Sequence, residues 1–263
     1  MADHNHASWI GRTHEAADVA AEAPVRRLAA LLDHDGAHWP DEALPPLGHW
    51  LFHLPDTAQS GLGRDGHPAR GGFLPPIARP RRMWAGSRVT FHAPIRFGAA
   101  MTKRTILTRI EDKGALTFVT LSHTILADGA VAVEEEQDLV YLAINSPRPP
   151  KAVETATAET VRHHRAEETL LFRFSAVTFN AHRIHYDLGY ARAVELYPAL
   201  VVHAPLQAML LVDHVLRDGI ELRRFAFRAL APLYAPGQFT TSRAGERMWV
   251  RDAAGTVTMT AER

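Results

Sequence analysis

The chain has 263 residues, which is enough for one large domain or for two of ordinary size. Its 29 basic and 29 acidic side chains give a formal net charge of zero, so no overall field draws it to nucleic acid or to an anionic membrane. Cysteine is absent, which excludes disulfides, thiolate metal sites and a cysteine nucleophile. With a polar N-terminus that does not resemble a signal peptide, this composition predicts a cytoplasmic protein.

The N-terminal half predicts one helix followed by an antiparallel sheet. Residues 17–33 carry apolar side chains at helical spacing, so we expect an amphipathic helix there. Three later segments are rich in Thr, Val, Ile and Leu and are separated by the turn sequences DKG and ADG, which predicts strands joined by hairpins. These strands are expected at residues 104–110, 116–125 and 131–142.

A proline-rich segment divides the chain. Residues 146–159 read SPRPPKAVETATAE, and no large apolar side chain anchors them, which is typical of a linker. We therefore expect an N-terminal subdomain at residues 1–145, a linker at residues 146–164 and a C-terminal subdomain at residues 165–263.

The C-terminal half repeats the pattern of the first, with a buried helix expected at residues 206–216. The segment FHAPIRFG at residues 91–98 is similar to FRALAPLYAPG at residues 227–237, which favours an internal duplication. A helix against an antiparallel sheet in each half places the protein in the α+β class. The strands of this half are predicted at residues 169–175, 222–230, 247–251 and 257–260.

The segment RFSAVTFNAHRIHYDLGYARAVELYPALVVHAPLQAMLL, residues 173–211, carries the functional signal. It resembles the signature of MaoC-like (R)-specific enoyl-CoA hydratases, in which an Asp is followed by a His five residues later and then by a His-Gly pair that opens a helix. In this chain Asn180 stands at the Asp position, His185 matches the His, and His203 and Ala204 stand at the His-Gly pair. The resemblance implies a double hot-dog fold with one competent site.

The departures from that signature narrow the resemblance. Asn180 replaces Asp, Arg183 replaces Pro and Ala204 replaces Gly, as in type 2 hydroxyacyl-thioester dehydratases and the related mesaconyl-CoA hydratases. In the first half, GGFLPP at residues 71–76 and PRRMWAG at residues 80–86 resemble the 3-methylfumaryl-CoA hydratase branch of that family.

Hydration of an enoyl thioester gives these residues their expected roles. Water must be deprotonated as it attacks the β-carbon, a proton must reach the α-carbon, and the enolate-like oxygen must be stabilised. With an ordinary pKa of about 6.5, His185 is the expected general base and acid. The Asn180 amide is expected to orient the water, although an Asn in a loop also commonly caps a turn.

The thioester oxygen is expected at the start of the helix that follows His203. There the first backbone N–H groups lack helical partners and the helix dipole favours negative charge. The small side chain of Ala204 would allow the thioester to approach. The resemblance adds further substrate-binding candidates in the two motifs: Gly72, Phe73, Arg82, Trp84 and Arg183. Three of them have a structural alternative, which is a plain turn for Gly72, a solvated arginine pair for Arg82 and a brace within the loop for Arg183.

We expect no metal and no redox cofactor, because coenzyme A is part of the substrate and the steps need only proton transfer. His182 and His185 share one turn, but no third ligand in the sequence is spaced to join them. The expected partner is a small acyl-CoA, with neither nucleic acid nor membrane, and the oligomeric state stays open, a homodimer included.

Three functions remain at this point. The first is a hydratase of a branched C4-dicarboxyl thioester such as 3-methylfumaryl-CoA or itaconyl-CoA, the second a (3R)-hydroxyacyl-thioester dehydratase of fatty acyl chains, and the third a non-catalytic module that binds acyl thioesters. A dicarboxylate needs a cation inside the pocket, whereas a fatty chain needs an apolar tunnel. Arginines near the motifs offer that cation: Arg70, Arg79, Arg82 and Arg183.

Overall fold

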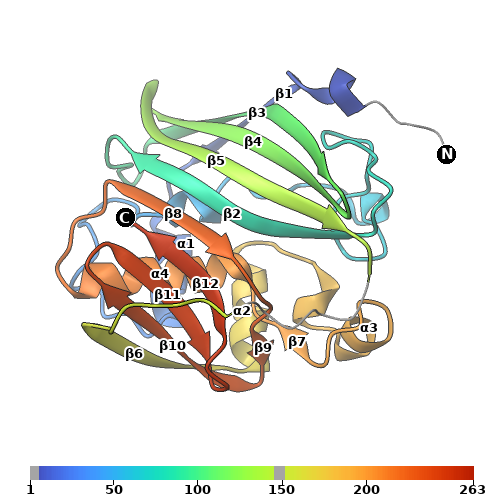
Figure 1. The fold of residues 1–263 in the computed structure, drawn as a ribbon. Coiled ribbons are helices and arrows are strands. Elements are labelled where there is room, and N and C mark those ends of the chain that lie inside the picture. Colours follow the sequence, from blue (N-terminus) through green and yellow to red (C-terminus); the bar gives the residue numbers. More distant parts are fainter. Residues whose placement is uncertain (1–5, 145–151) are drawn as a thin grey trace.

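The computed structural model describes residues 6–144 and 152–263. Within them, one antiparallel sheet of ten strands runs in the order β1-β3-β4-β5-β2-β8-β12-β11-β10-β6 (Figure 1). Its first five positions are β1 (Thr13–Val19), β3 (Ala100–Lys113), β4 (Leu116–Ala127), β5 (Ala130–Leu142) and β2 (Arg81–Phe91). The other five are β8 (Arg224–Ala229), β12 (Val257–Glu262), β11 (Arg247–Asp252), β10 (Gly237–Ala244) and β6 (Thr160–Ala166). A short second sheet pairs β7 (Leu200–Val201) with β9 (Tyr234–Ala235).

The helices α1 (Glu22–Leu31) and α4 (Ala204–Arg217) both lie behind the sheet in the view of Figure 1. Six further helical segments lie in the described part of the chain. They are α2 (Glu168–Val177), α3 (Leu188–Ala193) and the 3₁₀ turns η1 (His6–Trp9), η2 (Gly48–Leu51), η3 (Gln59–Gly61) and η4 (Arg183–His185). None of the helices in the described part of the chain is both long and apolar enough to cross a bilayer.

The two halves join through the antiparallel pairing of β2 with β8. At one end of this pairing Gly86 lies opposite Arg228, and a Cβ atom on Gly86 would be 2.4 Å from the Phe227 carbonyl oxygen. Only glycine allows the two backbones to approach this closely. Each half thus contributes five neighbouring strands to one continuous sheet, as the expected duplication requires.

The N-terminal half confirms the predicted strands but only part of the predicted helix. The three strands lie within β3, β4 and β5, and Gly114 and Gly129 adopt positive φ angles of 60° and 83° at the two hairpin turns. Residues 17–33 begin in β1 instead, because Thr13–Val19 pairs with β3, and the helix α1 starts at Glu22. Apolar spacing alone did not locate this strand-to-helix change.

The C-terminal half is built around α4, in which residues 206–216 are all buried, as predicted. The predicted strands at residues 222–230, 247–251 and 257–260 are confirmed as β8, β11 and β12. The strand predicted at residues 169–175 is wrong: this segment is the helix α2, which buries Leu171, Phe174 and Ser175 at helical spacing.

The predicted linker lies partly outside the described residues, which omit 145–151. The strand β6 begins at Thr160 and pairs with β10, so the structure places residues 160–164 in the sheet of the C-terminal half. The division of the chain into subdomains otherwise stays a prediction.

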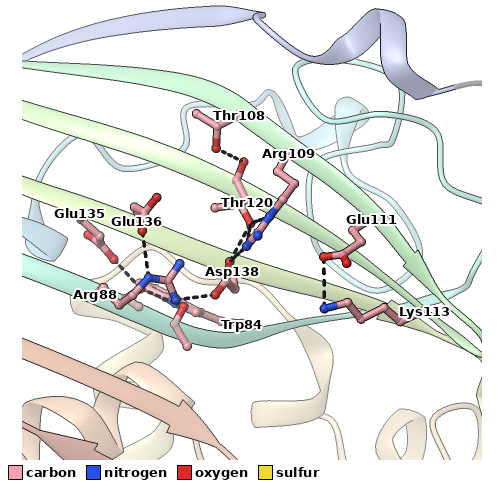
Figure 2. Close-up of polar contacts among 12 residues, drawn as sticks. Trp84, Arg88, Thr108, Arg109, Glu111, Lys113, Thr120, Glu135, Glu136 and Asp138 are labelled. Atoms are coloured by element: carbon pink, nitrogen blue, oxygen red, sulfur yellow. Dashed lines mark hydrogen bonds and ion pairs between the residues drawn. The ribbon is translucent and has the colours of Figure 1, made fainter.

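Side chains alternate between two faces of β5. On one face Arg88 binds Glu136 at 2.9 Å and Asp138 at 2.7 Å, as Figure 2 shows. Because successive residues of a strand point to opposite sides, Glu135 and Gln137 face the other way. Glu135 is 3% exposed and accepts a hydrogen bond from Ser87 Oγ at 2.6 Å. The sheet therefore carries polar side chains into the interior of the molecule, beside α4.

Candidate active site

The loop from Asn180 to His185 follows directly after α2. Phe179 leaves the helix with a φ of 48°, and the backbone N–H of Asn180 donates to Ser175 O at 2.8 Å, so the chain turns sharply. The Asn180 side-chain oxygen accepts from the His182 backbone N–H at 2.9 Å. This is the local turn that asparagine favours. Its amide nitrogen remains the group able to donate to a ligand.

The tautomer of His185 is set by its surroundings. Its Nδ1 lies 2.7 Å from the Val201 carbonyl oxygen, which can only accept, so Nδ1 carries the hydrogen and Nε2 keeps its lone pair. Burial lowers the pKa of His185 to about 4, although the bond to Val201 opposes the shift. The ring is therefore neutral at pH 7, with Nε2 ready to accept a proton.

His203 lies at the N-terminal end of α4 and packs directly on His185. The two rings are stacked with centroids 3.5 Å apart, and the ring of Phe174 lies 4.8 Å from His203. Its Nε2 is 2.9 Å from Ser175 Oγ, and burial lowers its pKa well below the ordinary value. Ala204 then begins α4, with Pro205 in the first turn. This arrangement holds a neutral base next to a helix N-terminus.

A loop of the N-terminal half packs against the Asn180–His185 loop. Gly66 has a φ of 87°, and a Cβ atom there would be 1.8 Å from the Ala181 carbonyl oxygen. The Arg183 backbone N–H donates to Asp65 O at 2.9 Å. The sequence did not reveal this contact, because residues far apart in the chain meet here. The glycine and proline content of this loop favoured a plain turn, and only its resemblance to the hydratase branch pointed to a loop that covers the substrate.

This loop brings Asp65 and His67 beside His182. His67 Nδ1 lies 3.1 Å from Asp65 Oδ2, and the His67 and His182 rings are 4.1 Å apart. Burial lowers the pKa of both histidines, most strongly that of His182, and the charge of Arg82 adds to both shifts. Burial alone would raise the pKa of Asp65, but the hydrogen bonds and charge of His67, with Arg82, lower it overall. The first half thus supplies an Asp-His pair to the site.

A cavity of about 170 Å³ adjoins the start of α4. Phe174, Thr178 and Pro205 line it from the C-terminal half, and Trp84 is among the residues that line it from the N-terminal half. Phe174 also contacts His203, so one side chain lies between the cavity and the stacked histidines. The cavity therefore lies next to the first turn of α4.

Comparison with known proteins identifies the family. The sequence profile described as hydroxyacyl-thioester dehydratase type 2 matches residues 47–235, which include both halves of the site. The mesaconyl-C(4)-CoA hydratase of Chloroflexus aurantiacus is 44% identical over 92% of this chain and 90% of its own length. The chain belongs to the hydroxyacyl-thioester dehydratase type 2 family. It is therefore a hydro-lyase, a hydratase or dehydratase of acyl thioesters, as its sequence predicted.

Solved structures confirm the fold of this type 2 dehydratase. HtdX of Mycobacterium tuberculosis superposes with a TM-score of 0.70 at 18% identity, covering 95% of this chain and 98% of its own. A second M. tuberculosis protein, described as having a double hotdog fold, superposes with a TM-score of 0.55 at 12% identity over 96% of this chain and 94% of its own. The predicted α+β double hot-dog is confirmed.

Most arginines near the motifs have structural partners in this family member. Arg70 donates to the carbonyl oxygens of Ile77, Arg79 and Pro80. The guanidinium of Arg79 binds Thr117 Oγ1 at 2.9 Å and the carbonyl oxygens of residues 114 and 115. Neither arginine presents its guanidinium as an unengaged cation to a substrate carboxylate.

The arginine pair at residues 81 and 82 does not form a solvated face. Arg81 is 5% exposed and binds Glu195 Oε2 at 2.8 Å, so the alternative of a solvated pair is wrong for it. Arg82 lies at the Asp65 and Tyr141 side chains, and its charge bears on the pKa of each. Of this pair, only Arg82 is placed beside the histidine cluster.

The remaining candidates are placed as follows. Arg183 binds Asp187 Oδ2 at 2.7 Å and the Arg64 carbonyl oxygen at 3.1 Å, which is the bracing role that the sequence also allowed. Gly72 and Phe73 lie at the N-terminal segment, where Arg12 donates to the Gly72 oxygen at 3.0 Å and the Phe73 ring is 5.9 Å from His14. Their assignment to substrate binding stays a prediction.

The histidine cluster also bears on the expectation of no metal. The sequence showed no third ligand spaced to join His182, but the fold supplies two, because ligand atoms of Asp65, His67 and His182 all lie within 4.8 Å of one another. Asp65 and His67 are also hydrogen-bonded to each other. The absence of a metal requirement stays a prediction, tested below.

Proposed function

We propose that the protein adds water to the double bond of an enoyl-CoA thioester whose acyl group is a branched C4 dicarboxylate. The substrate would be 3-methylfumaryl-CoA or its isomer itaconyl-CoA. The observation that supports this substrate most strongly is the 44% identity, over nearly the whole chain, to a hydratase named for mesaconyl-C(4)-CoA. The Val201 hydrogen bond that leaves His185 Nε2 free to accept a proton supports the reaction.

Each step has a residue suited to it. His185 Nε2 takes a proton from water as the water oxygen bonds to the β-carbon, and the electron pair of the double bond moves to the thioester oxygen. The Asn180 amide nitrogen donates to the attacking water and holds its oxygen in place. The imidazolium then returns the proton to the α-carbon, so one water is added and His185 is again neutral.

The enolate oxygen is stabilised by the start of α4. The N–H of Ala204 is one of the first helical donors, which lack carbonyl partners within the helix, and the positive end of the helix dipole lies at the same place. The pKa of about 4 for His185 suits the resting base, and the developing enolate beside it raises its proton affinity during the step. The imidazolium and the enolate therefore form side by side, with the His185 ring buried from water.

A substrate panel tests this proposal. The purified protein is incubated with 3-methylfumaryl-CoA, itaconyl-CoA, crotonyl-CoA and a long-chain 2-enoyl-CoA, and hydration is followed by loss of the conjugated absorbance and by mass. We expect kcat/KM to be highest for a dicarboxyl substrate. Fastest turnover of the long-chain thioester would support the fatty acyl dehydratase, and tight binding without turnover would support the non-catalytic module.

A further inference from the structure

The lining of the cavity beside α4 combines apolar side chains with a group of polar ones. Its volume is about 170 Å³, close to the roughly 150 Å³ that holds a benzene molecule, so it accommodates about six non-hydrogen atoms. Polar side chains line it from the N-terminal half, on β3, β4, β5 and the segment after η2: Lys103, His123, Glu135, Gln137 and His53. A fatty acyl chain here would leave the Lys103 ammonium without a partner, whereas a carboxylate would pair with it.

Lys103 is the cation of this cavity. Burial lowers the pKa of both lining histidines, that of His123 to about 4, so both are neutral at pH 7. Lys103 is thus the one lysine or arginine among the described residues that line the cavity. None of the described residues forms a hydrogen bond or a close ion pair with its ammonium group, and burial lowers its pKa.

The nearby Glu135 carboxylate is already engaged by other donors. His49 Nε2 lies 3.1 Å and Trp50 Nε1 2.9 Å from its Oε2, and Ser87 Oγ donates to its Oε1 at 2.6 Å. Its charge offsets part of the effect of burial on the pKa of Lys103, but it does not contact the ammonium group. Lys103 is half-buried and lines the cavity without a contacting anion, so a ligand carboxylate bound there can pair with its ammonium group.

The position of the cavity matches one end of the proposed substrate. Pro205 lines the cavity and directly follows Ala204, whose N–H would bind the thioester oxygen. In 3-methylfumaryl-CoA the free carboxylate is attached to the β-carbon, two carbons from the thioester carbonyl. The cavity is thus next to the proposed position of the thioester, where the free carboxylate of the substrate can reach it.

We propose that this cavity binds the free carboxylate of a dicarboxyl thioester and that Lys103 is its counter-ion. The inference rests on the proposed function for the identity of the thioester. According to this inference, Lys103 on β3 selects a carboxylate over an alkyl group at the β-carbon of the substrate. The arginines near the motifs do not make this selection.

Binding of two saturated thioesters tests the inference separately from turnover. Succinyl-CoA and butyryl-CoA differ by a carboxylate in place of a methyl group, and neither can be hydrated. Calorimetric titration should show that the wild-type protein binds succinyl-CoA more tightly. Lys103→Met should weaken succinyl-CoA binding on the order of 10²-fold, with little change for butyryl-CoA, and Lys103→Arg should keep part of the preference.

Lys113→Met is the matched control, since Lys113 is exposed at the end of the same strand and pairs with Glu111 at 3.2 Å (Figure 2). This variant should bind both thioesters as the wild type does. Equal loss for both ligands in Lys103→Met would overturn the inference and make Lys103 a structural partner of Glu135. A wild-type protein without a preference for succinyl-CoA would overturn it whether or not the variants fold. Selective binding without hydration of any enoyl-CoA would instead contradict the proposed function alone.

Discussion

The imidazole rings of His185 and His203 are stacked with centroids 3.5 Å apart, although His185 ends η4 and His203 precedes α4. Val201 O fixes Nδ1 of the first ring, and Ser175 Oγ binds Nε2 of the second. Because His203 directly precedes α4, the stack fixes the proton acceptor relative to the helix N-terminus. The stacked pair thus positions both the base and the oxyanion donors. A change in the Asn180–His185 loop should therefore lower the reaction rate more than it lowers the stability of the fold.

Asn180 offers the first test of that positioning. Asn180→Ala should lower kcat, because the attacking water loses a donor, while the KM changes little. Asn180→Asp should keep appreciable activity, since its oxygen can still accept from the His182 N–H at 2.9 Å, and its optimum should shift in pH. Steady-state kinetics of both variants check this. An Asp variant as inactive as the Ala variant would mean that the amide nitrogen itself is required.

The contact of Gly66 with Ala181 gives a second test. Gly66→Ala places a Cβ atom in conflict with the Ala181 carbonyl oxygen, so the Asn180–His185 loop must move. A displacement of about 1 Å in a catalytic group can cost on the order of 10²-fold in rate, and we expect a loss of kcat/KM of that order.

Gly36→Ala is the control for the backbone strain alone, because Gly36 has a φ of 83° but nothing within 4 Å of its added Cβ. Both variants should lose a similar small amount of stability to the positive φ. If Gly66→Ala and Gly36→Ala had the same activity in the enoyl-CoA assay, the packing of Gly66 against Ala181 would have no role in positioning the site.

Metal dependence is the third test. The proposed steps use proton transfer and backbone donors, so prolonged dialysis against EDTA should leave the rate unchanged. An activity that is lost on dialysis and returns with zinc would show that Asp65, His67 and His182 hold a metal ion. Metal analysis of the purified protein should accompany the assay, so that a tightly bound ion is not overlooked.

Stability should decline as the pH falls below about 6.5. The pKa of His123 and of His185 is lowered to about 4 in the folded protein, against about 6.5 in an unfolded chain. Between these values the unfolded state binds protons that the folded state does not, so each histidine costs on the order of 1.4 kcal/mol per pH unit. Urea unfolding between pH 7 and 4.5 checks this, and a constant free energy of unfolding over that range would contradict it.

The sequence predicted what depends on local pattern. The hairpins of β3, β4 and β5 followed from their turn residues, and α4 followed from its apolar length. The NAHRIH motif supplied His185 as the candidate base, a role that stays a prediction. The helix α2 was missed because Leu171 and Phe174 also fit a strand when their neighbours are unknown. Asp65, His67 and Lys103 could not be found, since their roles arise only when distant segments pack together in three dimensions.

The turnover of His185→Ala tests the central claim most directly. If Nε2 of His185 removes the proton from water, the variant should bind a saturated acyl-CoA as the wild type does and lose about 10²–10⁴-fold in kcat on its best enoyl-CoA substrate. Single-turnover hydration with a folded variant, verified by its melting curve, is the measurement. A His185→Ala variant that keeps nearly the wild-type kcat would contradict the account and leave the Asn180–His185 loop with a structural role.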